Sequence, residues 1–295
     1  MNFKILKDQQ LIGQIYGVEY GRMNFSFVEG VNQSIKDSIM EVLGSCEGIE
    51  QLKSNLVAQG YIINEMTFET NIQRDLNLEE KRNISFVYQS NLIENIVEIS
   101  EDELSRQFIR NFYGGHIGAW KYLRDLALAK KPISLSVLSS LHENISIEQK
   151  VLGHQIKNEH MGVIRDKDTV VMVGGRVCFP PSEDQLNSMF VKLNKSLEKL
   201  ISDSFTVDQV LNLASDFHYD YEIIHPYADG NGRTGRLMIN YIMVFCGLEP
   251  LVITNHDKQR YYECFGGQYD DHSVYKEKMY KFFVEKYKEN QSGLY

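Results

Sequence analysis

A polar, glycine-rich stretch of twelve residues constrains the fold of this chain more than any other segment. It reads His225-Pro226-Tyr227-Ala228-Asp229-Gly230-Asn231-Gly232-Arg233-Thr234-Gly235-Arg236. Upstream, apolar residues recur at helical spacing, and Pro226 disfavours helical geometry for the residue before it, so a helix is expected to end near Ile224. Downstream, the apolar positions between Leu237 and Phe245 predict a second helix that runs to Gly247. The stretch is therefore predicted to connect two helices.

The glycines and arginines of this stretch indicate an anion site. Gly230 and Gly232 allow the backbone to turn tightly and to approach a ligand closely. Backbone N–H groups at the start of a helix attract anions together with the helix dipole, and Arg233 and Arg236 add charge suited to phosphate oxygens. Each feature alone has an ordinary interpretation, because a Gly-Asn-Gly run is commonly a turn and an arginine pair is commonly solvated.

A carboxylate and an imidazole extend this prediction to a metal–phosphate site with a base beside it. Asp229 is hard to explain next to an anion unless it holds a cation, and Mg²⁺ is typically bound by one or two carboxylates plus phosphate oxygens. Imidazole suits proton transfer near neutral pH, and His225 supplies one. An EF-hand calcium loop is excluded, because Arg233 and Thr234 occupy its fifth and sixth positions and Asn240 stands where its glutamate belongs.

The same residues resemble the signature of the Fic (filamentation induced by cyclic AMP) family. That signature is His-Pro-Phe-x-Asp/Glu-Gly-Asn-Gly-Arg-x-x-Arg, and every defined position except one matches this chain. Tyr227 replaces the usual phenylalanine, which keeps the ring but adds a hydroxyl that needs a hydrogen-bond partner or solvent. The match is long and chemically mixed, so it is far more specific than a short glycine pattern.

The resemblance implies transfer of AMP from ATP to a Ser, Thr or Tyr hydroxyl of a protein, with release of pyrophosphate. His225 is then the general base, and Asp229 holds Mg²⁺ on the phosphates. Asn231 and the loop amides are implied to bind the α-phosphate, and the two arginines are implied to bind the β- and γ-phosphates. The implied phosphate-binding positions are Gly230, Asn231, Gly232, Arg233 and Arg236.

A predicted helix far upstream of the signature carries a second resemblance. The composition from Leu78 to Ile99 favours a helix, which would place Ser90 and Glu94 on one face. With the signature present, Ser90-Asn91-Leu92-Ile93-Glu94-Asn95 resembles the Ser/Thr-x-x-x-Glu-Gly/Asn inhibitory motif of one class of Fic proteins. That resemblance implies an inhibitory helix at about residues 79–99, in which Glu94 pairs with Arg236 and obstructs the γ-phosphate position. Alone, this spacing indicates only a polar helix surface.

A β-hairpin is predicted at about residues 168–180, where Gly174-Gly175 separates two apolar runs and Pro180-Pro181 ends the second. Its position before the signature resembles the Fic flap, which is implied to bind the main chain of a target protein by strand addition. The flap positions implied to dock the target are Val170, Val171, Met172, Val177, Cys178 and Phe179. Without the signature, an ordinary surface hairpin would be the preferred interpretation.

The predicted fold class is mainly α, a Fic-type helical bundle with a short hairpin flap. Helical periodicity recurs from Glu101 to Lys130, with a break at Gly114-Gly115 and Trp120 in the core. A further helix is expected from Ile133 to Leu141, followed by His142, which we interpret as structural. These helices outweigh the strand-like segments, as expected for a bundle.

Two parts are predicted along the chain: an N-terminal region at residues 1–75 and a Fic domain at residues 76–295. The N-terminal region resembles no family and is predicted to be a small α or α+β unit of unknown role. Apolar runs between Ile12 and Tyr20 allow one or two strands, and helices are expected around Ile35–Leu43 and before Gly60.

Composition and charge restrict the cellular context. The formal net charge of −9 argues against a general nucleic-acid binder, which would normally present a basic face. The four cysteines show no C-x-x-C spacing, so neither a zinc site nor a disulfide framework is predicted. No signal-peptide core follows Met1, and no apolar run is long enough to cross a membrane, so a cytoplasmic protein without a membrane partner is expected. A protein substrate is expected, and both self-modification and a homo-oligomer stay open.

Other functions also stay open. Gly232 favours AMP transfer over the kinase-like relatives, which carry lysine at that position. The same site chemistry would support removal of AMP or use of another nucleotide donor. A catalytically silent nucleotide-binding module is a further alternative, against which the intact His225, Asp229 and arginine pair weigh. A DNA-binding regulator is disfavoured, because the sequence has no recognisable reading motif.

Overall fold

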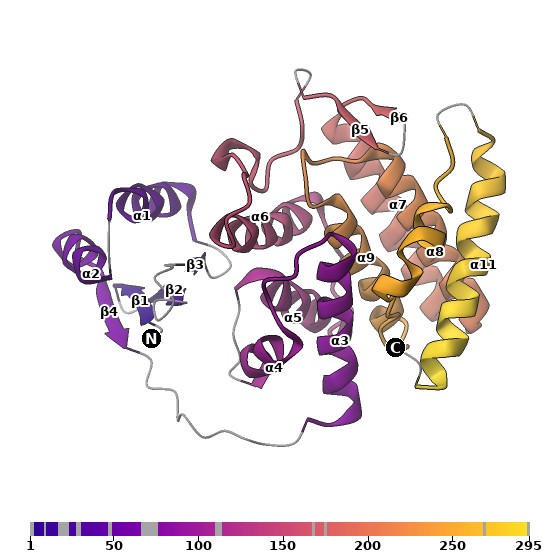
Figure 1. The fold of residues 1–295 in the computed structure, drawn as a ribbon, viewed down its shortest axis with the longest axis horizontal. Helices are drawn as coiled ribbons and strands as arrows, with labels where there is room; N and C mark the ends of the chain where they lie inside the picture. Colours follow the sequence, from indigo (N-terminus) through magenta and orange to yellow (C-terminus); the bar gives the residue numbers. More distant parts are fainter. Residues whose placement is uncertain are drawn as a thin grey trace.

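The computed structural model describes residues 3–8, 10–16, 24–27, 31–46, 49–65, 76–109, 114–166, 169–173, 176–267 and 270–293. The helices are α1 (Gln33–Ser45), α2 (Ile49–Ala58), α3 (Leu78–Ile93), α4 (Glu101–Ile109), α5 (Gly115–Leu128), α6 (Leu135–Val151), α7 (Glu183–Ser202), α8 (Val207–Ile224), α9 (Asn231–Phe245), α10 (Lys258–Tyr262) and α11 (His272–Gln291), with short 3-10 helices at Asn158–His160 and Asn255–Asp257. The strands are β1 (Phe3–Lys7), β2 (Gln10–Tyr16), β3 (Asn24–Phe27), β4 (Ile62–Glu65), β5 (Val171–Val173) and β6 (Arg176–Cys178). The helical predominance confirms the predicted fold class (Figure 1). None of the helices in these ranges is both long and apolar enough to span a bilayer.

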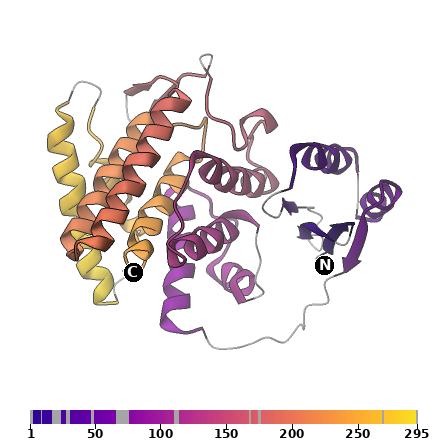
Figure 2. The ribbon, with the colours of Figure 1, turned by 180° about the vertical axis from the view of Figure 1, so that it is seen from behind.

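A small antiparallel sheet and two helices make up the N-terminal part of the chain. The strand order is β3-β2-β1-β4, and Phe3 and Ile5 on one face of β1 join a core with residues of α1 and α2. Figures 1 and 2 show this unit beside α6, where Lys36 Nζ lies 3.6 Å from a Glu143 carboxylate oxygen. The predicted strand residues 17–20 and the predicted boundary near residue 75 lie outside the described residues, so the two-part division stays a prediction.

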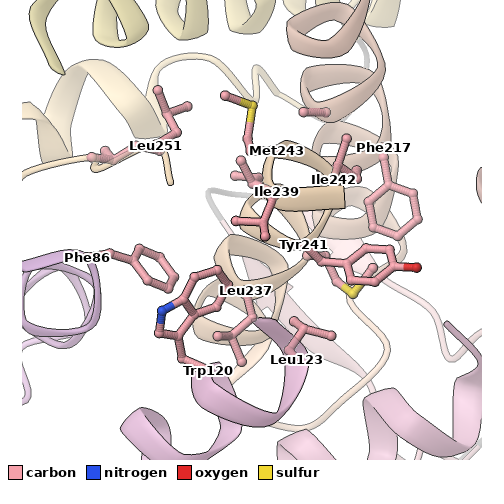
Figure 3. Packing of buried hydrophobic residues seen from close by; sticks show 14 of the residues in the cluster. Phe86, Trp120, Leu123, Phe217, Leu237, Ile239, Tyr241, Ile242, Met243 and Leu251 are labelled. Carbon is pink, nitrogen blue, oxygen red and sulfur yellow. The ribbon is translucent and has the colours of Figure 1, made fainter. Parts of the chain in front are cut away.

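Helix α9 is the central helix of the larger, helical part. Every residue of α9 except Gly232 is buried, as expected for a helix with neighbours on all sides. Figure 3 shows its apolar side chains, including Leu237 and Ile239, among Phe86 of α3 and Trp120 of α5. Because this packing fixes α9, it also fixes the signature residues that form the first turns of the helix.

The structure ends α3 at Ile93, whereas the sequence predicted a helix to Ile99. Asn95 has a left-handed backbone with φ of 60°, and the N–H of Ile96 donates to the Asn91 carbonyl at 3.0 Å. This is a Schellman motif, in which asparagine takes the position usually held by glycine. The helix prediction was too long because asparagine is a weaker stop signal than glycine or proline.

Helix α6 is longer than predicted. The sequence indicated Ile133–Leu141, but the helix begins after its N-cap Ser134 and runs on to Val151. Its last turns bury polar side chains, including His142, Glu148 and Gln149, along with Ile145, so polar residues interrupt the apolar stripe in the sequence.

The predicted hairpin is present in the described residues. β5 and β6 pair antiparallel, with Val171 opposite Cys178 and Met172 opposite Val177. Residue 168 and the predicted turn at 174–175 lie outside the described residues.

Candidate functional site

His225 ends α8 in a left-handed conformation, with φ of 50° and ψ of 65°. Its N–H donates to the Tyr221 carbonyl at 2.8 Å, which caps the helix. Left-handed backbone is disfavoured for residues other than glycine, so surrounding contacts must hold it. The imidazole is 14% exposed, and its Nδ1 lies 3.6 Å from a Glu222 carboxylate oxygen with no closer hydrogen-bond partner among the described residues. The ring therefore reaches the surface with a carboxylate behind it.

Glu222 stays ionised behind the imidazole. Burial alone would raise the pKa of Glu222, but contact with His225 and the nearby positive charge of Arg236 outweigh burial, so its pKa lies below the ordinary value. A carboxylate at Nδ1 favours a proton on that nitrogen and leaves Nε2 free to accept one. This orientation is what a general base requires.

The side chain of Asn231 closes the loop between α8 and α9. Its Oδ1 accepts from the Tyr227 N–H at 2.9 Å, and its Nδ2 donates to the Tyr227 carbonyl at 2.8 Å. Tyr227 stands where the signature has phenylalanine, and its additional hydroxyl lies 3.3 Å from Ser139 Oγ. Asn231, predicted as a phosphate ligand, therefore has its amide engaged within the loop, and its backbone N–H is the group left to face an anion.

His142 of α6 positions the same loop, a role that the sequence did not reveal. Its ring stacks on Tyr227 at a centroid distance of 3.8 Å. Gly162 N donates to Nδ1 at 2.9 Å, so Nε2 carries the proton that is donated to the Asp229 carbonyl at 2.8 Å. Burial lowers the pKa of His142 to about 4, which keeps the ring neutral at neutral pH.

The two arginines of α9 hold unpaired donors inside the protein. Arg233 donates through Nη2 to Gln149 Oε1, while its Nε and Nη1 are buried without a hydrogen-bond partner among the described residues. Arg236 Nη1 is likewise buried and unpartnered within that part of the chain. Buried guanidinium N–H groups without partners are unfavourable, and an anion would satisfy them. The loop and the start of α9 therefore fit the phosphates of a nucleotide.

Glu94 and Ser90 of the predicted inhibitory motif contact Arg236. Arg236 Nη2 donates to Glu94 Oε1 at 2.7 Å and to the Ser90 carbonyl at 3.0 Å, and its Nε donates to Ser90 Oγ at 2.9 Å. Burial would lower the pKa of Arg236, but the Glu94 carboxylate outweighs it and holds the pKa above its ordinary value. A Cβ on Gly232 would lie 2.2 Å from Glu94 Oε1, so glycine leaves the room that the carboxylate occupies.

Asp229 is the carboxylate that the sequence assigned to Mg²⁺. It is exposed, and its oxygens accept from the Gly230 N–H at 2.7 Å and from Gln149 Nε2 at 2.8 Å. Across the described residues, no cluster of three or more His, Cys, Asp or Glu side chains could hold a metal ion. A single carboxylate beside an anion site fits Mg²⁺ held largely by nucleotide phosphates, and it does not fit an all-protein metal cage.

Glu148 lies buried behind the signature and was also missed by sequence reasoning. Its Oε2 accepts from the His116 N–H at 3.0 Å, and His116 Nδ1 lies 2.7 Å from Asn91 Oδ1. Burial raises the pKa of Glu148 to about 7. This polar chain links α6 to α3, the helix that carries the Glu94 turn.

Comparison with known proteins identifies this part of the chain. Residues 132–243 match the model of the Fic/DOC family. They form a Fic domain. The protein adenylyltransferase Fic of Nematostella vectensis is 32% identical over 145 residues, which cover 49% of this chain and 31% of the relative. That of Drosophila grimshawi is 33% identical over 144 residues, covering 49% and 27%, so the match spans less than a third of either relative.

The structure comparison agrees at the level of the fold. A Fic-domain-containing signalling protein from Bacteroides thetaiotaomicron superposes with a TM-score of 0.53 at 19% identity. The superposition covers 70% of this chain and 85% of that one. The Fic fold therefore extends beyond the segment that matches the family model.

The hairpin of the Fic domain exposes some of the predicted docking side chains. Val170, Met172 and Phe179 are 50%, 72% and 71% exposed. Val171 and Val177 are half-buried. The Cys178 side chain, in contrast, is buried against the body of the domain, so it is not available to a target.

Glu148→Gln is expected to remove a pH dependence of stability. Burial raises the folded-state pKa of Glu148 from 4.5 to about 7, so its stabilising contribution is fully present below pH 4.5 and is lost as the pH rises through 7. The loss is about 3 kcal/mol. Urea unfolding of both proteins between pH 4 and 8 should show the difference in unfolding free energy changing by that amount. The buried histidines titrate in both proteins and cancel, so a flat difference would contradict the prediction.

Gly115→Ala is expected to lower the free energy of unfolding by about 2–4 kcal/mol. Gly115 has φ of +63°, and a Cβ there would lie 1.9 Å from Glu148 Oε1, which would push the carboxylate off the His116 N–H. Gly153→Ala is the matched control, since Gly153 has φ of +94° and nothing in the described residues lies within 4 Å of an added Cβ. Urea unfolding should show that the control loses about 1–2 kcal/mol of unfolding free energy. Equal losses would mean that the Glu148 contact contributes nothing.

Proposed function

We propose that this chain transfers AMP from ATP to a hydroxyl group of a protein. The observation that carries the proposal is an imidazole, His225, at the end of α8, joined by a short loop to the buried and unpaired guanidinium donors of Arg233 and Arg236 at the start of α9. The names of the curated relatives, protein adenylyltransferase Fic, support it. A site that only bound phosphate would not need a base. A base together with donors for several phosphates is what nucleophilic attack on a phosphorus atom requires.

Each residue has a defined part in the proposed reaction. His225 Nε2 takes the proton of the target hydroxyl, whose oxygen forms a bond to the α-phosphorus of ATP, while the bond from that phosphorus to the bridging oxygen breaks and pyrophosphate leaves. The first N–H groups of α9 stabilise charge on the α-phosphate, and Arg233 and Arg236 hold the β- and γ-phosphates. Asp229 would hold Mg²⁺, which supplies positive charge to the leaving pyrophosphate.

Glu94 makes this an autoinhibited enzyme in our proposal. Its carboxylate occupies Arg236, the guanidinium that the γ-phosphate needs, and places like charge next to the phosphates. ATP bound beside it would be misaligned for attack on the α-phosphorus. We further propose that the exposed edge of the hairpin docks the target by strand addition, and that the reaction takes place in the cytoplasm, where the four free cysteines stay reduced.

Mass spectrometry tests the proposal. The wild-type chain, Glu94→Gly and Glu94→Gly/His225→Ala are incubated with ATP and Mg²⁺, alone and in cell lysate, and intact masses and peptides are searched for AMP adducts. We expect adducts with Glu94→Gly and none with the double variant. Measurable ATP binding without an adduct in any sample would overturn AMP transfer and favour AMP removal, another donor or a silent binding module.

A further inference from the structure

Arg165 is a buried residue that connects the hairpin to the end of α8. It lies between the 3-10 helix after α6 and β5, and it is 3% exposed. Its guanidinium donates to main-chain carbonyls of two segments: His225 at 2.8 Å and Ile224 at 3.3 Å, and Thr169 at 2.8 Å, Cys178 at 2.9 Å and Phe179 at 3.3 Å. The planar fork of an arginine presents five donors on three nitrogens to fixed acceptors, whereas a lysine has three donors on a single nitrogen.

On the α8 side, these bonds stabilise the backbone that aims the imidazole. Carbonyls in the last turn of a helix have no intrahelical donor, and a cation at this end also interacts favourably with the helix dipole. The backbone N–H of Arg165 donates to the Pro226 carbonyl at 2.9 Å. Arg165 therefore binds the chain on both sides of the His225 Cα. The left-handed geometry of His225 needs such support, because it is unfavourable by about 1–3 kcal/mol.

On the hairpin side, the same guanidinium holds both arms. The paired strands are short, β5 being Val171–Val173 and β6 being Arg176–Cys178, and a two-stranded hairpin is marginally stable by itself. Thr169 precedes the first strand and Phe179 follows the second, so Arg165 binds the hairpin at its base. The position of this base therefore determines where the hairpin presents the exposed side chains of Met172 and Phe179.

We propose that Arg165 is a positioning residue that holds the His225 backbone and the hairpin in one fixed arrangement, so that a hydroxyl of a target docked along the hairpin meets the imidazole. Its consequence for catalysis rests on the proposed AMP transfer. A displacement of about 1 Å in such an arrangement lowers turnover by about 100-fold.

The test uses the full chain with Glu94→Gly as the reference and adds Arg165→Met, which keeps an unbranched apolar side chain and removes every guanidinium donor while the backbone N–H of residue 165 stays. Arg165→Lys keeps the charge, and Arg106→Met is the matched control, because Arg106 is a half-exposed residue of α4. Hydrogen exchange is followed by mass spectrometry in peptides that cover the hairpin and the end of α8. AMP incorporation from labelled ATP into the chain or into lysate protein gives kcat and the KM for ATP.

For Arg165→Met we expect faster exchange in both segments together, a loss in kcat of about 100-fold and a change in the KM for ATP of less than about threefold. Arg165→Lys should give intermediate values and Arg106→Met none. Faster exchange in only one segment, or in both with kcat unchanged, would overturn the inference. If the Glu94→Gly reference transfers no AMP, the proposed function fails. The hydrogen-exchange data then still decide whether Arg165 connects the hairpin to the end of α8. If Arg165→Met does not fold by circular dichroism, the comparison of Arg165→Lys with the reference decides.

Discussion

His225→Ala, introduced into a chain that already carries Glu94→Gly, is expected to lower the rate of AMP transfer by about 10²- to 10⁴-fold. The imidazole is the base that the proposed mechanism needs, and Glu222 lies 3.6 Å behind its Nδ1. ATP affinity should change by less than about threefold, because the proposed phosphate donors belong to Arg233, Arg236 and the start of α9. Initial rates with labelled ATP, and calorimetric titration of ATP into the same proteins, give the two quantities.

His160→Ala is the control for this substitution. His160 lies in the short helix Asn158–His160, where its Nε2 is 3.8 Å from a Glu159 carboxylate oxygen. This variant should keep the rate of the Glu94→Gly reference. A His225→Ala protein that still transferred AMP at more than about a tenth of that rate would mean that another group removes the proton.

Glu94→Gly alone is expected to raise the rate of AMP transfer by about 10- to 100-fold over the wild-type chain. The variant frees the N–H of Arg236 Nη2 that donates to Glu94 Oε1 at 2.7 Å, while the bond from Nη2 to the Ser90 carbonyl stays, and it removes a carboxylate from the position next to Gly232. Glu94→Gln separates charge from bulk, since it keeps the size of the side chain. The rate of Glu94→Gln should lie between the other two, measured in the same assay with labelled ATP.

Two results would contradict autoinhibition by Glu94. In the first, Glu94→Gly leaves the rate unchanged while His225→Ala abolishes it, so that transfer is real but not restrained. In the second, Glu94→Gly lowers the rate, which would make the carboxylate a participant in the reaction. Urea unfolding of the variant accompanies the assay, so that a loss of folded protein is not mistaken for a loss of rate.

The sequence predicted the parts of the fold that follow local rules. Helix α8 ends at Ile224 before the proline, α9 runs almost to Gly247, and the hairpin pairs as expected. Pro226 and the glycines act on the backbone within a few residues, so their effect can be read locally. The contact between Glu94 and Arg236, 142 residues apart, was expected only through the family resemblance.

The supporting residues of the site could not be predicted from periodicity. Gln149, which bridges Asp229 and Arg233, and Arg165, which binds carbonyls of the hairpin and of α8, are polar residues whose types are usually exposed. Their partners lie 60 or more residues away, or they are main-chain carbonyls, which every residue type has and which no sequence pattern marks. Only the folded arrangement shows that these side chains are buried and what they bind.

The order of residues in the site has a consequence for protein synthesis. Glu94 precedes its partner Arg236 by 142 residues, and ribosomes add about 10 residues each second, so the Glu94 turn is made roughly 14 seconds before the arginine. Helix α3 and helix α9 belong to one hydrophobic core, so the loop at 225–230 and α9 can pack only after α3 has been synthesised. Under the proposed inhibition, Glu94 is therefore already part of the nascent chain when the proposed phosphate-binding loop and α9 fold. No folded stage on the ribosome has this loop without the inhibitory carboxylate.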